Sequence, residues 1–201
     1  KNNDWIYQFF KQHKFRAENF LVSSYFDINE VNNFDVVFLL GYTKILSKKK
    51  LSKNSLTMVV HESNLPEGAG FSPLQWQLLA GKSEVNISLI EALEKVDSGD
   101  ILLQDTIFFD GTELYEEIRS KQAVATINII EQFLLLYPNF TRSKQTGVPS
   151  FYRKRGVDDS ELDFQKSIED NFNLLRVSNN EEWPSFFFYK KQKFIVKIYK
   201  G

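Results

Sequence analysis

Two polar segments of the sequence carry residue types suited to proton transfer. His61 begins the first, directly after an apolar run, and Gly68 and Gly70 follow it. Asp97 begins the second, a tight Asp-Ser-Gly-Asp-Ile turn, 36 positions after His61. A histidine titrates near neutral pH, and a carboxylate bonded to it, directly or through a water, orients the ring and favours its charged form. Taken singly, each segment is more often an ordinary turn or a structural histidine.

Apolar runs that alternate with helical patterns predict the framework around these residues. Residues 34–40 and 56–60 have the pattern of strands buried on both faces, with a crossover between them at 42–51. Two more strands are expected at 85–93 and 101–109. The sequence therefore predicts an α/β fold with a doubly wound, mostly parallel sheet. Ligands of such sheets bind beyond the carboxyl ends of the strands, where His61 falls.

Helices are expected between and around these strands. An opening helix begins near Asp4, and a short strand follows at residues 20–24. Ser72 has the residue type of an N-cap and precedes a proline, which starts a short helix. A long helix is expected from about residue 112 to 137. A doubly wound fold ordinarily has a strand before its first helix, so we expect the natural N-terminus to lie upstream of Lys1.

The pattern changes after the long helix. We expect a loop there, then a strand near Tyr152, a helix at 162–176 and a strand pair at 185–189 and 193–199. This division predicts a catalytic core at residues 1–140. The remaining part, residues 141–201, is expected to form a helix and a small β-hairpin appendage on the substrate side of the core.

Composition narrows the chemistry and the partners. The chain of 201 residues has 25 Lys and Arg against 26 Asp and Glu, so no overall field attracts nucleic acid or an anionic membrane. It has no cysteine and only His13 and His61 as histidines, so we expect no metal centre. No apolar run approaches the roughly 20 residues that span a bilayer. We expect a cytoplasmic location, and the oligomeric state stays open.

Together, the two polar segments resemble the formyltransferase family, which includes methionyl-tRNA formyltransferase, glycinamide ribonucleotide formyltransferase and the sugar-nucleotide N-formyltransferases. That family carries Asn-x-His, then Ser and Leu-Pro, a glycine-rich stretch to Pro, and Asp-x-Gly-x-Ile 36 residues after the histidine. The matching positions here are His61, Ser63, Leu65, Pro66, Gly70, Pro73, Gly81, Asp97, Gly99 and Ile101. One position departs from the pattern, because Val59 replaces the family asparagine, an amide donor for an oxyanion.

The C-terminal region resembles the sugar-nucleotide branch of this family. The resemblance is carried by residues 152–159, by Arg176 and by the Trp-Pro-Ser-Phe-Phe run at 183–187. The His-Glu-Ser-x-Leu-Pro-x-Gly form and the compact length are most similar to small formyltransferases acting on amino sugars of the pseudaminic acid type. The resemblance implies transfer of a formyl group from N10-formyltetrahydrofolate to the amine of a UDP- or dTDP-linked amino sugar.

The resemblance also implies roles for particular residues. His61 and Asp97 are the expected catalytic pair. The expected folate-binding residues are Tyr42, Asn64, Leu65, Pro66, Asn86, Leu93 and Glu94, with Asn64, Asn86 or a backbone amide as a substitute for the missing asparagine. The expected substrate-binding residues are Ser63, Gly70, Tyr152, Arg153, Lys154 and Arg155, the last three because guanidinium and ammonium groups bind phosphate.

Plainer interpretations of these residues stay open. Leu65 and Leu93 fit core packing nearly as well as folate contact, and Arg153, Lys154 and Arg155 fit a solvated surface run. Two alternative functions also remain. One is formylation of another amine, such as methionyl-tRNA, and the other is a non-catalytic relative that binds folate or a nucleotide.

Overall fold

The computed structural model describes residues 4–16 and 19–201, and its centre is a four-stranded sheet. The strands follow the order β1 (Val36–Leu39), β2 (Leu56–His61), β4 (Glu84–Glu91) and β5 (Ile101–Phe108). β1 and β2 are parallel, whereas β2 with β4 and β4 with β5 are antiparallel. The predicted α/β class is confirmed, and the expected parallel pairing is found between β1 and β2.

The change of direction in the sheet follows from the connections between its strands. A parallel neighbour needs a crossover, and the segment between β1 and β2 includes the short helix α2 (Lys48–Leu51). β4 and β5 are joined by residues 92–100 alone, which lets the chain fold back beside itself. The turn made by this connection contains Asp97.

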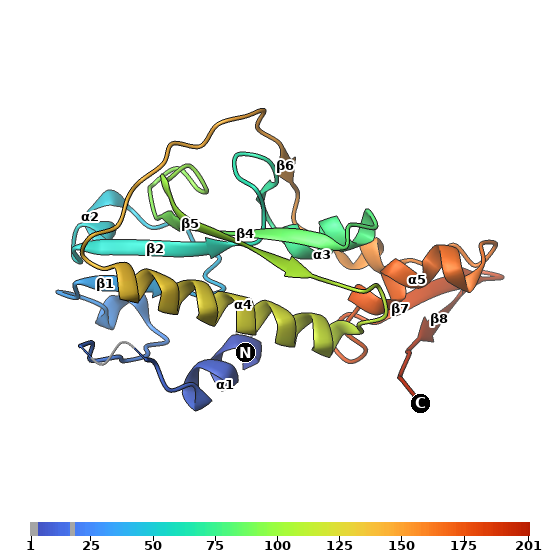
Figure 1. The fold of residues 1–201 in the computed structure, drawn as a ribbon. Coiled ribbons are helices and arrows are strands. Elements are labelled where there is room, and N and C mark those ends of the chain that lie inside the picture. Colours follow the sequence, from blue (N-terminus) through green and yellow to red (C-terminus); the bar gives the residue numbers. More distant parts are fainter. Residues whose placement is uncertain (1–3, 17–18) are drawn as a thin grey trace.

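One face of the sheet is covered by the long helix α4 (Tyr115–Leu136), as Figure 1 shows. Met58, Leu89 and Phe133 are fully buried between the sheet and this helix. Removing such side chains from water is the main stabilising contribution to the fold. Helix α1 (Asp4–Gln12) packs on α4 through Ile6.

The other face of the sheet lies beneath the loop that follows β2. This loop holds the two-residue strand β3 (Ala69–Gly70) and leads into α3 (Pro73–Leu79). β3 pairs in parallel with β6 (Phe151–Tyr152), the strand that follows α4 in the sequence. The loop is therefore closed by a segment about 80 residues further along the chain.

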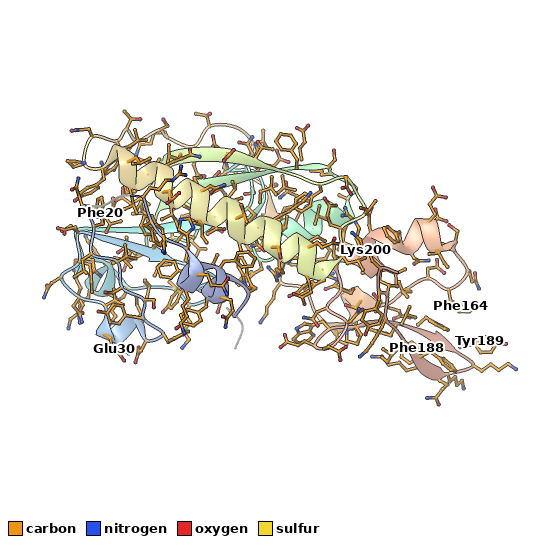
Figure 2. The ribbon with its side chains drawn as sticks, turned by 60° about the horizontal axis from the view of Figure 1, so that its bottom comes forward. Phe20, Glu30, Phe164, Phe188, Tyr189 and Lys200 are labelled. Atoms are coloured by element: carbon orange, nitrogen blue, oxygen red, sulfur yellow. The ribbon has the colours of Figure 1, made fainter. Side chains whose placement is uncertain are left out.

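The C-terminal region contains the predicted helix and hairpin. Helix α5 (Ile168–Val177) starts later than residue 162, because Ser167 caps it by accepting a hydrogen bond from the Asp170 amide. β7 (Ser185–Tyr189) and β8 (Gln192–Val196) form the antiparallel pair, which confirms the hairpin. Figure 2 shows Phe164, Phe188 and Tyr189 around it. Two single-turn 3-10 helices complete the fold, η1 (Ile28–Glu30) and η2 (Val157–Ser160).

One local prediction is wrong, and a second is confirmed in position only. Residues 20–24 form no strand, because they have no sheet neighbour, and Leu21 is 97% exposed. Phe20 instead packs edge to face on Tyr137 with ring centroids 5.7 Å apart. Ser72 is the N-cap residue of α3 and Pro73 follows it, as predicted, but Ser72 has a left-handed backbone and its side chain makes no capping hydrogen bond. Among the described residues, no helix is long and apolar enough to span a membrane.

Candidate active site

The structure brings His61 and Asp97 together, as their spacing predicted. Nδ1 of His61 lies 3.7 Å from Oδ1 of Asp97, and both side chains are 7% exposed. This distance is too long for a direct hydrogen bond, but it suits an ion pair or a single bridging water. β2 supplies the histidine at its carboxyl end, and the turn between β4 and β5 supplies the carboxylate.

The orientation of the His61 ring is set by a backbone carbonyl and not by Asp97. Nε2 of His61 lies 2.9 Å from the carbonyl oxygen of Gly68. A carbonyl only accepts hydrogen bonds, so Nε2 carries a proton and donates it. In the neutral ring Nδ1 is then the free base, and it faces Asp97. The Gly68 carbonyl therefore has the orienting position that was expected of Asp97, and the carboxylate faces the other ring nitrogen.

Asp97 is itself held in an uncommon backbone conformation. Its φ is +53°, which is the left-handed region that residues with a Cβ rarely occupy. Oδ2 accepts a 2.8 Å hydrogen bond from the backbone N–H of Gly70. The two carboxylate oxygens therefore have different partners. Oδ1 faces His61, and Oδ2 is bonded to the backbone of Gly70 in the loop after β2.

Two glycines allow the close approaches that build this site. Gly70 has a φ of +101°, and a Cβ there would lie 2.3 Å from the Tyr152 carbonyl oxygen. At Gly99 a Cβ would lie 1.7 Å from the carbonyl oxygen of Glu91. A side chain at either position would push apart backbones that must touch. The glycines in the two predicted segments are thus steric requirements of the fold.

A row of polar side chains crosses the sheet from His61. His61 is paired with Ser88 on β4, and Ser88 is paired with Gln104 on β5, so the three side chains share one face. Nε2 of Gln104 donates to Oγ of Ser88 and to Oδ1 of Asn64, both at 3.1 Å. Asn64 and Gln104 also line a groove of about 480 Å³ between the β2 loop and residues 143–146.

The residues expected to bind folate fall into two groups. Near the Asp97 turn, Leu93 is 48% exposed, and Glu94 accepts a 2.7 Å hydrogen bond from the Lys48 amide. Tyr42 packs with Val59 and Ala92 in the cluster under the same turn. Leu93 is therefore the exposed apolar side chain of this first group.

The second group lies on the β5 side. Asn64 is bonded to Gln104, and the amide oxygen of Asn86 accepts from Thr106 at 3.3 Å. Leu65 is 2% exposed, and Pro66 accepts the Ser150 amide through its carbonyl.

The residues expected to bind the nucleotide surround Trp76 on α3. The Tyr152 ring is nearly parallel to Trp76, with centroids 6.4 Å apart, and the guanidinium carbons of Arg153 and Arg155 lie 4.9 and 5.9 Å from the indole. Lys154 is exposed. Of the two remaining substrate candidates, Ser63 is 1% exposed, and Gly70 is committed to β3.

Asp159 engages two of these cations. Arg153 donates to both carboxylate oxygens of Asp159, once at 2.7 Å, and this lowers the pKa of that carboxyl group. Burial lowers the pKa of Arg155. Arg155 donates to the backbone carbonyl oxygen of Asp159 at 3.1 Å. Within the described part of the chain, Arg153 is thus the one of the three cations that pairs with a carboxylate, and Lys154 is exposed.

Sequence reasoning missed three participants in this site. Trp76 appeared only as a position in a short helix, and its stacking partners come from residues 152–155. Gln145 and Ser150 bond to the backbone of the two site loops. A bond from a side chain to a distant backbone atom leaves no residue-type pattern, so no signal was available for either. Across residues 4–16 and 19–201 no three His, Asp or Glu side chains form a metal-binding group.

One protein family and several known proteins match this chain. The family model described as formyl transferase matches residues 2–133, which contain His61, Asp97 and the whole central sheet. The bifunctional polymyxin resistance protein ArnA of Wigglesworthia glossinidia brevipalpis is 29% identical over 169 residues, 81% of this chain and 25% of the relative. The methionyl-tRNA formyltransferase of Coprothermobacter proteolyticus is 29% identical over 147 residues, 72% and 48% of the two chains.

A solved structure extends the likeness to the fold. The 4-N formyltransferase from Francisella tularensis superimposes with a TM-score of 0.68 at 17% identity, covering 82% of this chain and 70% of that one. At this identity the likeness concerns the fold. The chain spans between 25% and 56% of the length of the curated relatives that it matches here.

Proposed function

Because the chain belongs to the formyl transferase family, we propose that it transfers a formyl group from N10-formyltetrahydrofolate to the amine of a nucleotide-linked amino sugar. The observation that carries this proposal is the buried pair of His61, at the end of β2, and Asp97, in the turn between β4 and β5, which face each other across 3.7 Å. A buried histidine beside a fixed carboxylate is an arrangement that can move protons. The folate supplies the electrophilic formyl carbon.

His61 accepts the proton that the attacking amine loses. The proton goes to Nδ1, because Nε2 is already bonded to Gly68. Asp97 then faces a positive imidazolium, which its charge stabilises. The amine nitrogen adds to the formyl carbon and the carbonyl electron pair moves to oxygen, which gives a tetrahedral oxyanion. The carbonyl re-forms as the bond from carbon to N10 breaks, and His61 gives its proton to N10. No net proton is consumed.

Negative charge on the formyl oxygen needs a donor that Val59 cannot supply. Val59 shares the sheet face of His61 but packs into the cluster around β1. Asn64 spends its amide oxygen on Gln104, so its NH₂ group is free to donate toward the groove. Asn86 bonds Thr106 one row further from His61 and is the weaker substitute.

The acceptor amine is proposed to be carried by a sugar nucleotide. Tyr152 provides a ring for a base, and Lys154 provides an exposed cation for a phosphate. The net charge of −1 supports a small acceptor over a large polyanion. A second candidate acceptor is methionyl-tRNA. The observation that supports it is the similarity of this chain to a methionyl-tRNA formyltransferase.

One incubation separates these candidates. The protein is mixed with N10-formyltetrahydrofolate and, in parallel, with UDP- and dTDP-linked amino sugars or with methionyl-tRNA, and each acceptor is analysed by mass spectrometry. A formyl adduct on an amino sugar, with tetrahydrofolate released, is the expected result. Formylation of methionyl-tRNA alone would replace the sugar with tRNA as the acceptor. No adduct on any acceptor would refute catalysis.

A further inference from the structure

The turn that presents Asp97 is held from outside by the side chain of Gln145. Nε2 of Gln145 donates to the carbonyl oxygens of Asp97 and Gly99, both at 2.8 Å. A primary amide has two N–H donors, so both are used on this turn. Gln145 is half-buried and carries no charge, and it lies 48 positions from Asp97 in the chain.

Gln145 belongs to a segment that touches both loops of the candidate active site. We call residues 142–152 the strap; Figure 1 shows it running from the end of α4 over β5 to β6. At its start, Ser143 exchanges two backbone hydrogen bonds with Ile101. At its end, Oγ of Ser150 accepts from the amide of Gly68 at 2.8 Å. The strap therefore fixes the carbonyl that orients His61 and the turn that carries Asp97.

Gln145 is the member of the strap whose side chain reaches Asp97. Arg142 and Lys144 make ion pairs with Glu91 and Asp100, but these cations are 46% and 84% exposed. Exposed pairs of this kind stabilise little and hold a geometry weakly. The two hydrogen bonds from Gln145 instead restrain Asp97, whose left-handed backbone needs support from its surroundings.

We propose that Gln145 is a positioning residue, which sets the Asp97 carboxylate at the distance from His61 that proton transfer requires. It acts through Asp97, because both of its donors bond the turn that carries this residue. The catalytic part of this inference rests on the proposed function. A purely structural role would make Gln145 matter for folding alone, so the test must separate the two.

Gln145→Glu is the sharpest variant, because it keeps the shape and removes both donors. Gln145→Asn keeps the donors but shortens their reach, and it adds no charge. Gln165→Glu makes the same exchange at an exposed position and is the matched control. Single-turnover formyl transfer is measured for each, with Asp97 intact and in the Asp97→Asn background, beside folate affinity and Tm.

With Asp97 intact, both Gln145 variants are expected to slow transfer by about 10- to 100-fold, the usual effect of a small misplacement of a reacting group. Folate affinity and the control should stay at wild-type values. In the Asp97→Asn background, Gln145→Glu should cause no further loss, because the residue it positions is already disabled. An equal loss in both backgrounds, or wild-type rates for both variants, would overturn the proposal.

A second measurement does not depend on turnover. The chain has two histidines, so the imidazole ¹⁵N resonances of His61 can be assigned with a His13→Gln sample. Gln145→Glu and Gln145→Asn are expected to move the Nδ1 resonance in the direction that Asp97→Asn moves it. Unchanged resonances in both variants, with a clear response to Asp97→Asn, would refute positioning. If wild-type protein formylates no acceptor, the proposed function fails while this result still decides the role of Gln145.

Discussion

The carbonyl oxygen of Gly68 lies 2.9 Å from Nε2 of His61. Gly68 follows His61 by seven residues, in the loop after β2. This contact leaves one ring nitrogen for chemistry and turns it toward Asp97. The contact therefore favours one tautomer of the histidine, the arrangement that the proposed proton transfer needs. The carboxylate acts on an imidazole that is already oriented.

Substitution of the central pair should remove activity and leave the fold intact. His61→Asn and Asp97→Asn are each expected to lower the single-turnover rate by roughly two to four orders of magnitude, as for other acid–base groups. The double variant should lose little more than the worse single one, because residues that act as a unit are non-additive. Near wild-type formylation by His61→Asn would rule out this assignment. Folate binding serves as the control and should survive both changes.

The cations beside Trp76 should affect substrate binding more than rate. Lys154→Met is expected to raise the KM for the sugar nucleotide and leave kcat nearly unchanged, since a phosphate contact is shared by ground state and transition state. Arg153→Met and Arg155→Met should also raise KM. Steady-state kinetics tests this, with Lys49→Met as a control on an exposed run. A large fall in kcat at constant KM would contradict the role.

Gly99 should tolerate no side chain. In Gly99→Ala the new Cβ would meet the carbonyl oxygen of Glu91 at 1.7 Å, so the Asp97 turn or β4 must move. A loss of about 1–3 kcal/mol in the free energy of unfolding is expected, as for other overpacked sites, together with a slower transfer rate. Gly156→Ala is the control, because the nearest atom to its Cβ would be 3.9 Å away. Equal stability of both variants in urea would disprove the steric argument.

Stability at low pH should depend on Glu131. Hydrogen bonds from Arg16 lower the pKa of this carboxyl from 4.5 to about 2, and His13 lies on its other oxygen at 2.9 Å. A lowered folded-state pKa contributes stability above pH 4.5 that is lost as pH falls toward 2. Glu131→Gln should therefore lower Tm by a few degrees at pH 7, and the difference should vanish near pH 2.

Glu116→Gln provides the comparison for that experiment. Glu116 lies on the same helix but is exposed, so its replacement should leave Tm nearly unchanged at every pH. A Glu131→Gln deficit that persists undiminished at pH 2 would show that the lost contribution is not the ionised carboxylate.

Apolar periodicity and the residues that end helices and strands were enough to predict most elements of secondary structure. β4, β5, α4 and the hairpin of β7 and β8 lie close to their predicted positions, because each has a long apolar pattern bounded by proline, glycine or charge. The failed strand at residues 20–24 shows the limit. A short apolar run becomes a strand only when a neighbour offers hydrogen bonds, and the sequence does not say where neighbours lie.

The sequence by itself was enough to predict that His61 and Asp97 lie together, since residue type and a spacing of 36 positions are visible in the chain. Tertiary structure alone decided how the pair is held. Three contacts show this: Nε2 of His61 with the Gly68 carbonyl, Gln145 with the Asp97 carbonyl, and Arg153 with the Asp159 carboxylate. Each of them forms only because the folded chain brings its two partners together. Two of these contacts end on backbone oxygens, which every residue type carries, so only the path of the folded chain brings the right ones within reach.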